Sequence, residues 1–93
     1  MLKRGCTGRG FIRITFKDQY GIECSLQESS LATESCIWLG CNKPNPRVHL
    51  PGQGWKSIEL PIESVSDTRM HLTREQVKEL LPYLQQFVET GGL

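Results

Sequence analysis

Apolar and polar residues alternate along residues 11–27, and this alternation predicts the first structural unit. Within residues 11–17, apolar side chains at Ile12, Ile14 and Phe16 alternate with polar ones, which is typical of a half-buried strand. Asp18–Gly21 has the residue types of a tight turn, and the alternation resumes from Ile22 to Leu26. We therefore predict a β-hairpin over residues 11–27.

Two further strands are predicted after a polar loop at residues 27–35, which Leu31 and Ala32 are expected to anchor. Cys36–Leu39 is a short apolar run closed by Gly40, and residues 68–72 alternate directly before a helix. On this pattern Trp38 is expected in the core.

The best-defined element is a C-terminal helix over residues 73–90. Thr73 and Gln76 have the spacing of a capping box, Pro82 is expected to bend or split the helix, and Gly91 and Gly92 end it. Its apolar stripe is Val77, Leu80, Leu81, Leu84, Phe87 and Val88. Neither this stripe nor an apolar sheet face is stable in water alone. The expected fold class is α+β, a small antiparallel sheet covered by this helix.

The chain is predicted to be a single domain over residues 1–93. Residues 1–10 are expected to be a flexible N-terminus. Residues 41–61 hold four prolines and two glycines, and they predict a long surface loop with at most short strand pieces at 48–50 and 57–60. Long irregular loops in small domains are often functional, so this loop is a candidate binding element.

Composition narrows the class of protein. Hydrophobic residues make up 38% of the 93 residues, charged ones 23%, and the formal charge is +1, so no global charge attracts nucleic acid or lipid. No stretch has the length of a membrane span or the pattern of a signal peptide, which predicts a cytoplasmic protein with four free thiols. The cysteines lack the close pairs of a zinc site, so no metal is expected.

No catalytic motif occurs in the chain, so we expect neither an enzyme nor a cofactor. Residues 9–16 partly match an RNA-binding pattern, but Ile12 and Arg13 stand where a small residue and an aromatic are needed. Nucleic acid is therefore disfavoured as a partner.

Basic and aromatic residues on expected exposed faces are the candidates for binding a partner or ligand. Trp55 has two open interpretations: it either fills the open edge of a small core or contacts a partner. The candidate set is Arg13, Arg47, His49, Trp55, Lys56, Arg69 and His71.

Two stretches, Asp18–Gly40 and Met70–Leu93, together resemble a group of short proteins encoded by bacteriophages and prophages. The resemblance implies a phage accessory protein in the cytoplasm of an infected bacterium, of the counter-defence, anti-CRISPR-like type. No established catalytic or binding residue comes with this group, so none is transferred.

Three functions follow as hypotheses. The first is stoichiometric inhibition of a host defence protein such as a CRISPR effector. The second is an oligomeric small-ligand binder that sequesters a nucleotide immune signal, and the third is nucleic-acid binding. A homodimer and a monomer both remain open, because so small a sheet has exposed edges.

Overall fold

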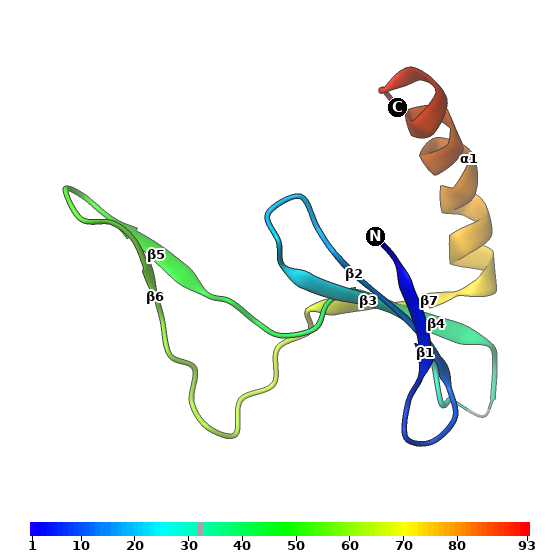
Figure 1. Cartoon of the computed structure of the whole chain (residues 1–93), viewed down its shortest axis with the longest axis horizontal. Coiled ribbons are helices and arrows are strands. Elements are labelled where there is room, and N and C mark those ends of the chain that lie inside the picture. Colours follow the sequence, from blue (N-terminus) through cyan, green and yellow to red (C-terminus); the bar gives the residue numbers. More distant parts are fainter. Residues whose placement is uncertain (32) are drawn as a thin grey trace.

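The computed structural model describes residues 1–31 and 33–93, and it confirms the α+β fold class. Five strands form one antiparallel sheet in the order β1-β2-β3-β4-β7, and two more form a separate hairpin (Figure 1). The elements are β1 (Lys3–Cys6), β2 (Ile12–Lys17), β3 (Glu23–Glu28), β4 (Cys36–Cys41), β5 (Arg47–Leu50), β6 (Gly54–Ser57), β7 (Arg69–Thr73) and α1 (Arg74–Thr90).

The predicted hairpin over residues 11–27 is confirmed as β2 and β3, with Ile14 paired to Leu26. Asp18 closes the turn: its Oδ1 accepts hydrogen bonds from the backbone N–H of Tyr20 and Ile22 at 2.8 and 2.9 Å. Gly21 has a positive φ of 82°, a backbone conformation that residues with a side chain rarely adopt. Turn chemistry therefore fixes the register of these two strands.

The strand register gives the sheet two unlike faces, because residues directly opposite each other project to the same side. One face carries the row Ile14, Leu26, Leu39 and Met70, and we call it the apolar face. The other carries the row Arg13, Gln27, Trp38 and His71, and we call it the polar face.

The N-terminus differs from the expectation of a flexible segment at residues 1–10. Lys3–Cys6 forms the edge strand β1, which pairs antiparallel with β2 from Lys3↔Thr15 to Cys6↔Ile12. The turn between them is held by Thr7, whose carbonyl and hydroxyl accept from the N–H groups of Gly10 and Phe11 at 2.9 and 3.1 Å. The sequence KRGC has no apolar alternation, so its pairing comes only from the neighbouring strand.

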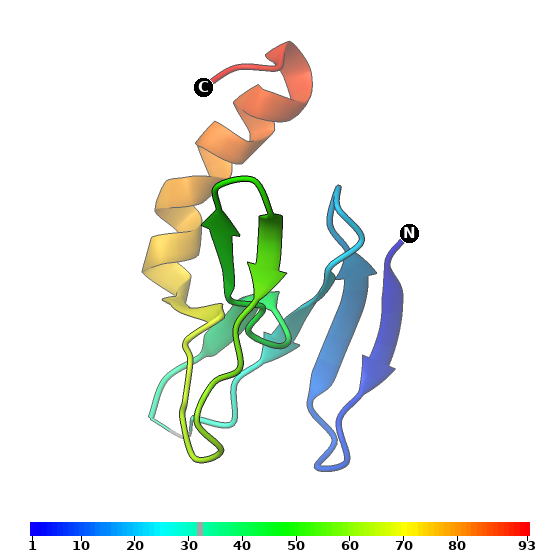
Figure 2. The ribbon, with the colours of Figure 1, turned by 90° about the vertical axis from the view of Figure 1, so that its left-hand side faces the viewer.

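The excursion between β4 and β7 is more ordered than a loop. β5 and β6 pair antiparallel and project away from the sheet as a hairpin arm, defined here as residues 46–58 (Figures 1 and 2). Pro51 and Gly52 form its turn, with the Gln53 N–H donating to the Leu50 carbonyl at 3.0 Å. Of the expected strand pieces, 48–50 lies within β5, whereas 57–60 overlaps β6 only at Ser57.

The C-terminal helix has the predicted caps and begins at Arg74, one residue after the predicted start. The Thr73 hydroxyl accepts from the Gln76 N–H at 3.2 Å, and the Gln76 side chain accepts from the Thr73 N–H at 2.9 Å. The helix ends at Gly91, whose backbone has the left-handed conformation. Pro82 does not split the helix, which runs as one element through it.

The expected cover of the sheet by the helix is not what the structure has. The helix rises from the end of β7 and points away from the sheet (Figure 1), and none of its residues is buried. Leu81, Leu84 and Phe87 are 57%, 53% and 57% exposed. The buried residues in the described part of the chain are Cys24, Ser25 and Cys36.

The thiols lie mostly within the sheet. Cys24 and Cys41 face each other on the apolar face with their sulfurs 3.9 Å apart, and Cys6 is exposed. Burial raises the pKa of Cys24, and the Cys41 thiol adds to this; burial also raises the pKa of Cys36, with a further contribution from Glu34. These two thiols therefore stay protonated at neutral pH.

The 27–35 loop is described except at one position. Gln27 and Glu28 extend β3 instead of opening the loop, and Leu31 is 44% exposed, so it does not anchor a core. Ala32 lies outside the described residues.

The helix that the described residues form is too short and too polar to cross a membrane.

Candidate ligand-binding face

An aromatic pair lies at the centre of the polar face. Trp38 on β4 and His71 on β7 are direct cross-strand partners, and their rings stack with centroids 3.9 Å apart and planes 9° apart. Trp38 is half-buried and His71 is exposed. Because β7 is the last strand of the sheet, the His71 ring extends the aromatic surface to the sheet edge.

Arg69 is fixed beside this pair by two hydrogen bonds. Its Nη1 donates to the Ser25 hydroxyl at 3.2 Å and to the Gln27 side-chain oxygen at 3.0 Å. Its guanidinium carbon lies 5.7 Å from the centroid of the Trp38 ring, within the range of a cation–π contact. The charge is therefore held in one place before any ligand arrives.

Gly40 allows the backbone of β7 to approach β4 closely at Arg69. Arg69 extends from β7 over β4 to residues of β3, and Gly40 is the β4 residue directly between Arg69 and Ser25. A Cβ at Gly40 would stand 2.5 Å from the Thr68 carbonyl oxygen and 2.9 Å from the Arg69 Cα, and its φ is 147°. Only glycine fits this backbone, because a side chain would collide with the main chain of β7.

The charge of the polar face is predominantly positive. The register places Lys3, Arg13 and Lys17 on the same side as Arg69, and Glu23 at the far end of β3 is the acidic residue there. His71 Nε2 lies 3.0 Å from the Ser29 hydroxyl, which orients its ring. A flat, anionic group would therefore meet both an aromatic surface and several cations.

A second aromatic cluster lies on the hairpin arm. His49 and Trp55 are cross-strand partners with ring centroids 5.1 Å apart and planes tilted by 60°. The Arg47 guanidinium carbon lies 5.8 Å from the Trp55 centroid. Trp55 is 67% exposed, so it does not fill the edge of a core in this chain.

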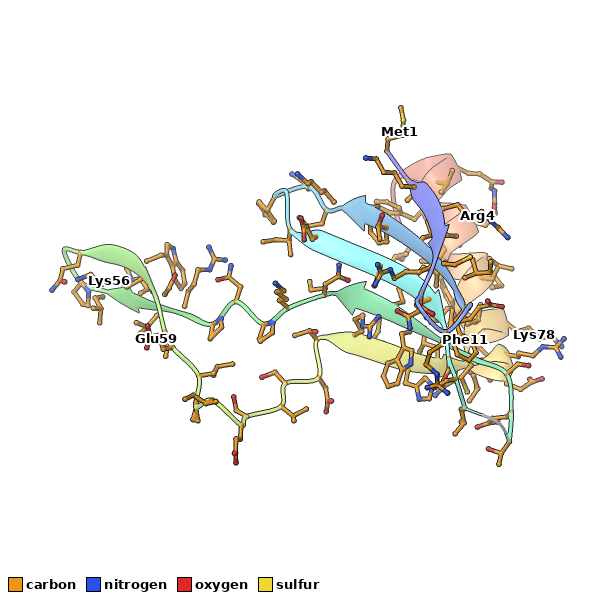
Figure 3. The ribbon with its side chains drawn as sticks, turned by 60° about the horizontal axis from the view of Figure 1, so that its bottom comes forward. Met1, Arg4, Phe11, Lys56, Glu59 and Lys78 are labelled. Carbon is orange, nitrogen blue, oxygen red and sulfur yellow. The ribbon has the colours of Figure 1, made fainter. Side chains whose placement is uncertain are left out.

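The structure divides the predicted site residues into two groups. Arg13, Arg69 and His71 share the polar face, whereas the other four lie on the arm. On the arm, Lys56 pairs with Val48 and projects opposite to Trp55; it lies on the arm far from the sheet (Figure 3). The four arm residues are Arg47, His49, Trp55 and Lys56.

Sequence reasoning missed Trp38 as a surface residue. The sequence did hold a signal for it, because successive side chains of a strand point to opposite faces. Ile37 and Leu39 flank Trp38, so Trp38 projects to the face opposite theirs. Ser25 and Gln27, which hold Arg69, had no sequence signal, since their role depends on pairing between β3, β4 and β7.

Metal chemistry finds no support in the described residues, where no group of three His, Cys, Asp or Glu side chains is placed to hold an ion. Comparison with protein-family models, curated proteins and solved structures found no match.

Proposed function

We propose that this chain is a non-catalytic binding protein whose polar face binds an anionic ligand with a flat ring, of the nucleotide class. The observation that carries the proposal is the stacked Trp38–His71 pair with Arg69 held beside it. A nucleotide has both chemical features that this surface can recognise, a planar base and a phosphate.

The aromatic part of the face supports stacking of a base. The exposed ring of His71 is backed by Trp38 at 3.9 Å, so a base that stacks on it meets a surface already ordered. Base–aromatic stacking contributes roughly 1–3 kcal/mol per base. Such stacking is largely independent of the base, so the base alone gives little specificity.

The cationic part supports recognition of a phosphate. Arg69 is fixed by Ser25 and Gln27, and Arg13 is exposed in the same row as Trp38. A pre-positioned guanidinium pays less ordering entropy when it binds an anion than a mobile one does. Arg69 is therefore expected to set the position of the phosphate relative to the base.

Isothermal titration calorimetry of the full chain with mononucleotides, cyclic nucleotides and ADP-ribose tests this proposal. We expect saturable binding of at least one ligand, and His71→Ala should weaken it by roughly 1–3 kcal/mol. The matched control is His49→Ala on the arm, which should leave the affinity unchanged. Flat titrations with every ligand, or equal loss in both variants, would contradict the proposal.

The hairpin arm supports a second candidate function, binding of a host protein. Trp55 is 67% exposed beside Arg47, and tryptophan and arginine are the residues most enriched among interface hot spots. This candidate keeps the expectation of a phage inhibitor that acts by stoichiometric binding.

Capture of bacterial host proteins on the full chain, with plaque assays across defence systems, tests the second candidate. Trp55→Ala should abolish capture of a stoichiometric partner. Tyr20→Ala is the matched control, because Tyr20 is an exposed aromatic in the turn between β2 and β3, away from the arm. If the two variants retain the partner equally, the arm is not the binding element.

A further inference from the structure

The chain exposes far more solvent-accessible surface than a folded monomer of its mass usually does. Its accessible surface is 8100 Å². A folded monomer of 10.6 kDa exposes about 5,500 Å² by the usual scaling with mass. The radius of gyration, 16.4 Å, likewise exceeds the ~12 Å expected for a domain of this length. About 2,600 Å² is therefore in excess.

Part of the exposed surface is formed by two apolar surfaces of the same chain, beside that of the hairpin arm and the segment after it. One is the helix stripe, where Leu84 is 53% and Val88 is 78% exposed. The other is the apolar face of the sheet, where Met70 is 55% exposed and Ile14, Leu26 and Leu39 are only half-buried. A helix of 17 residues has little stability in water unless its apolar side is covered.

The helix cannot readily fold back onto its own sheet, because no linker separates them. Thr73 is the last residue of β7, where it pairs with Cys36, and it is also the N-cap of the helix. Helical residues begin directly at Arg74. The capping box between Thr73 and Gln76 therefore fixes the direction in which the helix leaves the sheet, and Figures 1 and 2 show it rising away from the strands.

The first turn of the helix faces the apolar side of the sheet. A hollow of about 600 Å³ lies beside this first turn, lined by Ile37, Leu72 and Val77 and, for the larger part, by residues of the segments 28–31 and 33–36. Val77 opens the helix stripe, and Ile37 and Leu72 belong to the apolar face by register. The stripe and the sheet thus form the two sides of an open angle, into which another helix can enter.

We propose that two copies of this chain form a two-fold homodimer in which the helix stripe of each packs on the apolar sheet face of the other. A two-fold axis uses each surface once per chain, so both unpartnered surfaces are covered together. A standard interface buries ~800 Å² per partner, about a third of the excess surface of one chain. The hairpin arm and the polar face stay free in this arrangement.

Sedimentation equilibrium of the full chain tests the stoichiometry. We expect a dimer, and Leu84→Lys at the centre of the stripe should raise the dimer dissociation constant by at least about a hundredfold. Gln86→Lys is the matched control on the opposite side of the helix, and it should leave the constant unchanged. Because Leu84 is 53% exposed in the single chain, its replacement does not remove a buried residue of the monomer.

Isotope-filtered NMR on a mixture of labelled and unlabelled chains tests the arrangement. We expect intermolecular NOEs from the side chains of Leu84 and Phe87 to the methyl groups of Ile14 and Leu39. A monomer at tens of micromolar overturns the proposal. So does a dimer whose intermolecular NOEs connect helix to helix or strand to strand without any between helix and sheet.

Discussion

The polar face and the hairpin arm carry the same three residue types in different settings. Each has a tryptophan, a histidine across the strand pair and an arginine whose guanidinium carbon lies 5.7 or 5.8 Å from the indole. On the polar face the two rings are parallel at 3.9 Å, and on the arm they are tilted at 5.1 Å. The arginine of the polar face makes two side-chain hydrogen bonds, to Ser25 and Gln27.

The difference comes from the number of neighbouring strands. Trp38 lies between β3 and β7 in a five-stranded sheet, so its surroundings are set from both sides. Trp55 lies in a two-stranded ribbon, which is at best marginally stable by itself in water. The same side chains thus give a pre-organised surface in one place and an adaptable one in the other.

Removing the support under the polar cluster should have the largest effect. Gly40→Ala places a Cβ against the Thr68 carbonyl and the Arg69 Cα, at a φ that alanine disfavours. We expect a loss of about 2–4 kcal/mol in the free energy of unfolding, measured by urea denaturation. Gly8→Ala, where a Cβ meets nothing within 4 Å, should change it by less than about 0.5 kcal/mol. Equal effects would mean that β4 and β7 do not approach this closely.

The next largest effect is the difference between Arg69 and Arg47 in how much the replacement of each lowers the free energy of unfolding. Arg69→Met leaves the hydroxyl of Ser25, a residue that is 1% exposed, without this donor, and we expect a cost of about 1–3 kcal/mol. Arg47→Met on the arm should cost less than about 0.5 kcal/mol, because Arg47 is exposed. Thermal or urea unfolding of both variants measures the contrast, and a larger loss for Arg47 would reverse the comparison.

The tryptophans should differ in access to solvent. In a Trp38→Phe variant the remaining indole is Trp55, whose fluorescence should be quenched readily by acrylamide because it is 67% exposed. In Trp55→Phe the remaining Trp38 is half-buried and stacked on His71, so its quenching constant should be smaller. Equal constants would show that the arm shields Trp55 in solution.

The smallest expected effect is on the pH dependence of stability. The pKa of Cys24 is raised in the folded chain above its ordinary value of 9.0, so ionisation of this thiol favours the unfolded state. The contribution is complete below about pH 9 and is lost as pH rises through the folded pKa. Cys24→Ala should therefore flatten the fall in unfolding free energy between pH 8 and 11, while Cys6→Ala should not.

Local patterns were enough to predict the β2–β3 hairpin, β4, β7 and the helix with its caps. In each, the signal lies within the segment: alternation around Ile14, the turn at Asp18–Gly21, the Thr73–Gln76 capping box. β1 and the arm strands were missed or only partly predicted, because Lys3–Cys6 has no alternation and prolines surround Val48. Their pairing depends on the neighbouring strand.

The candidate site was only half predictable. Basic residues such as Arg13 and Arg69 could be chosen from their parity in a strand, but no local pattern separates them from Arg47. The division into two clusters follows from the sheet order, in which β4 and β7 become neighbours although residues 42–68 lie between them. Amphipathicity also predicted that the helix stripe packs on the chain's own sheet, whereas no residue of the helix is buried.

The arm is inserted between two adjacent strands of the sheet. The chain leaves β4 and returns to β7 at neighbouring positions, where the Cys41 N–H donates to the Thr68 carbonyl at 3.2 Å. The excursion is therefore an enlarged hairpin connection, and the entropy of closing such a connection grows only slowly with its length. A longer, shorter or wholly different arm is therefore compatible with the same sheet, without refolding of the scaffold.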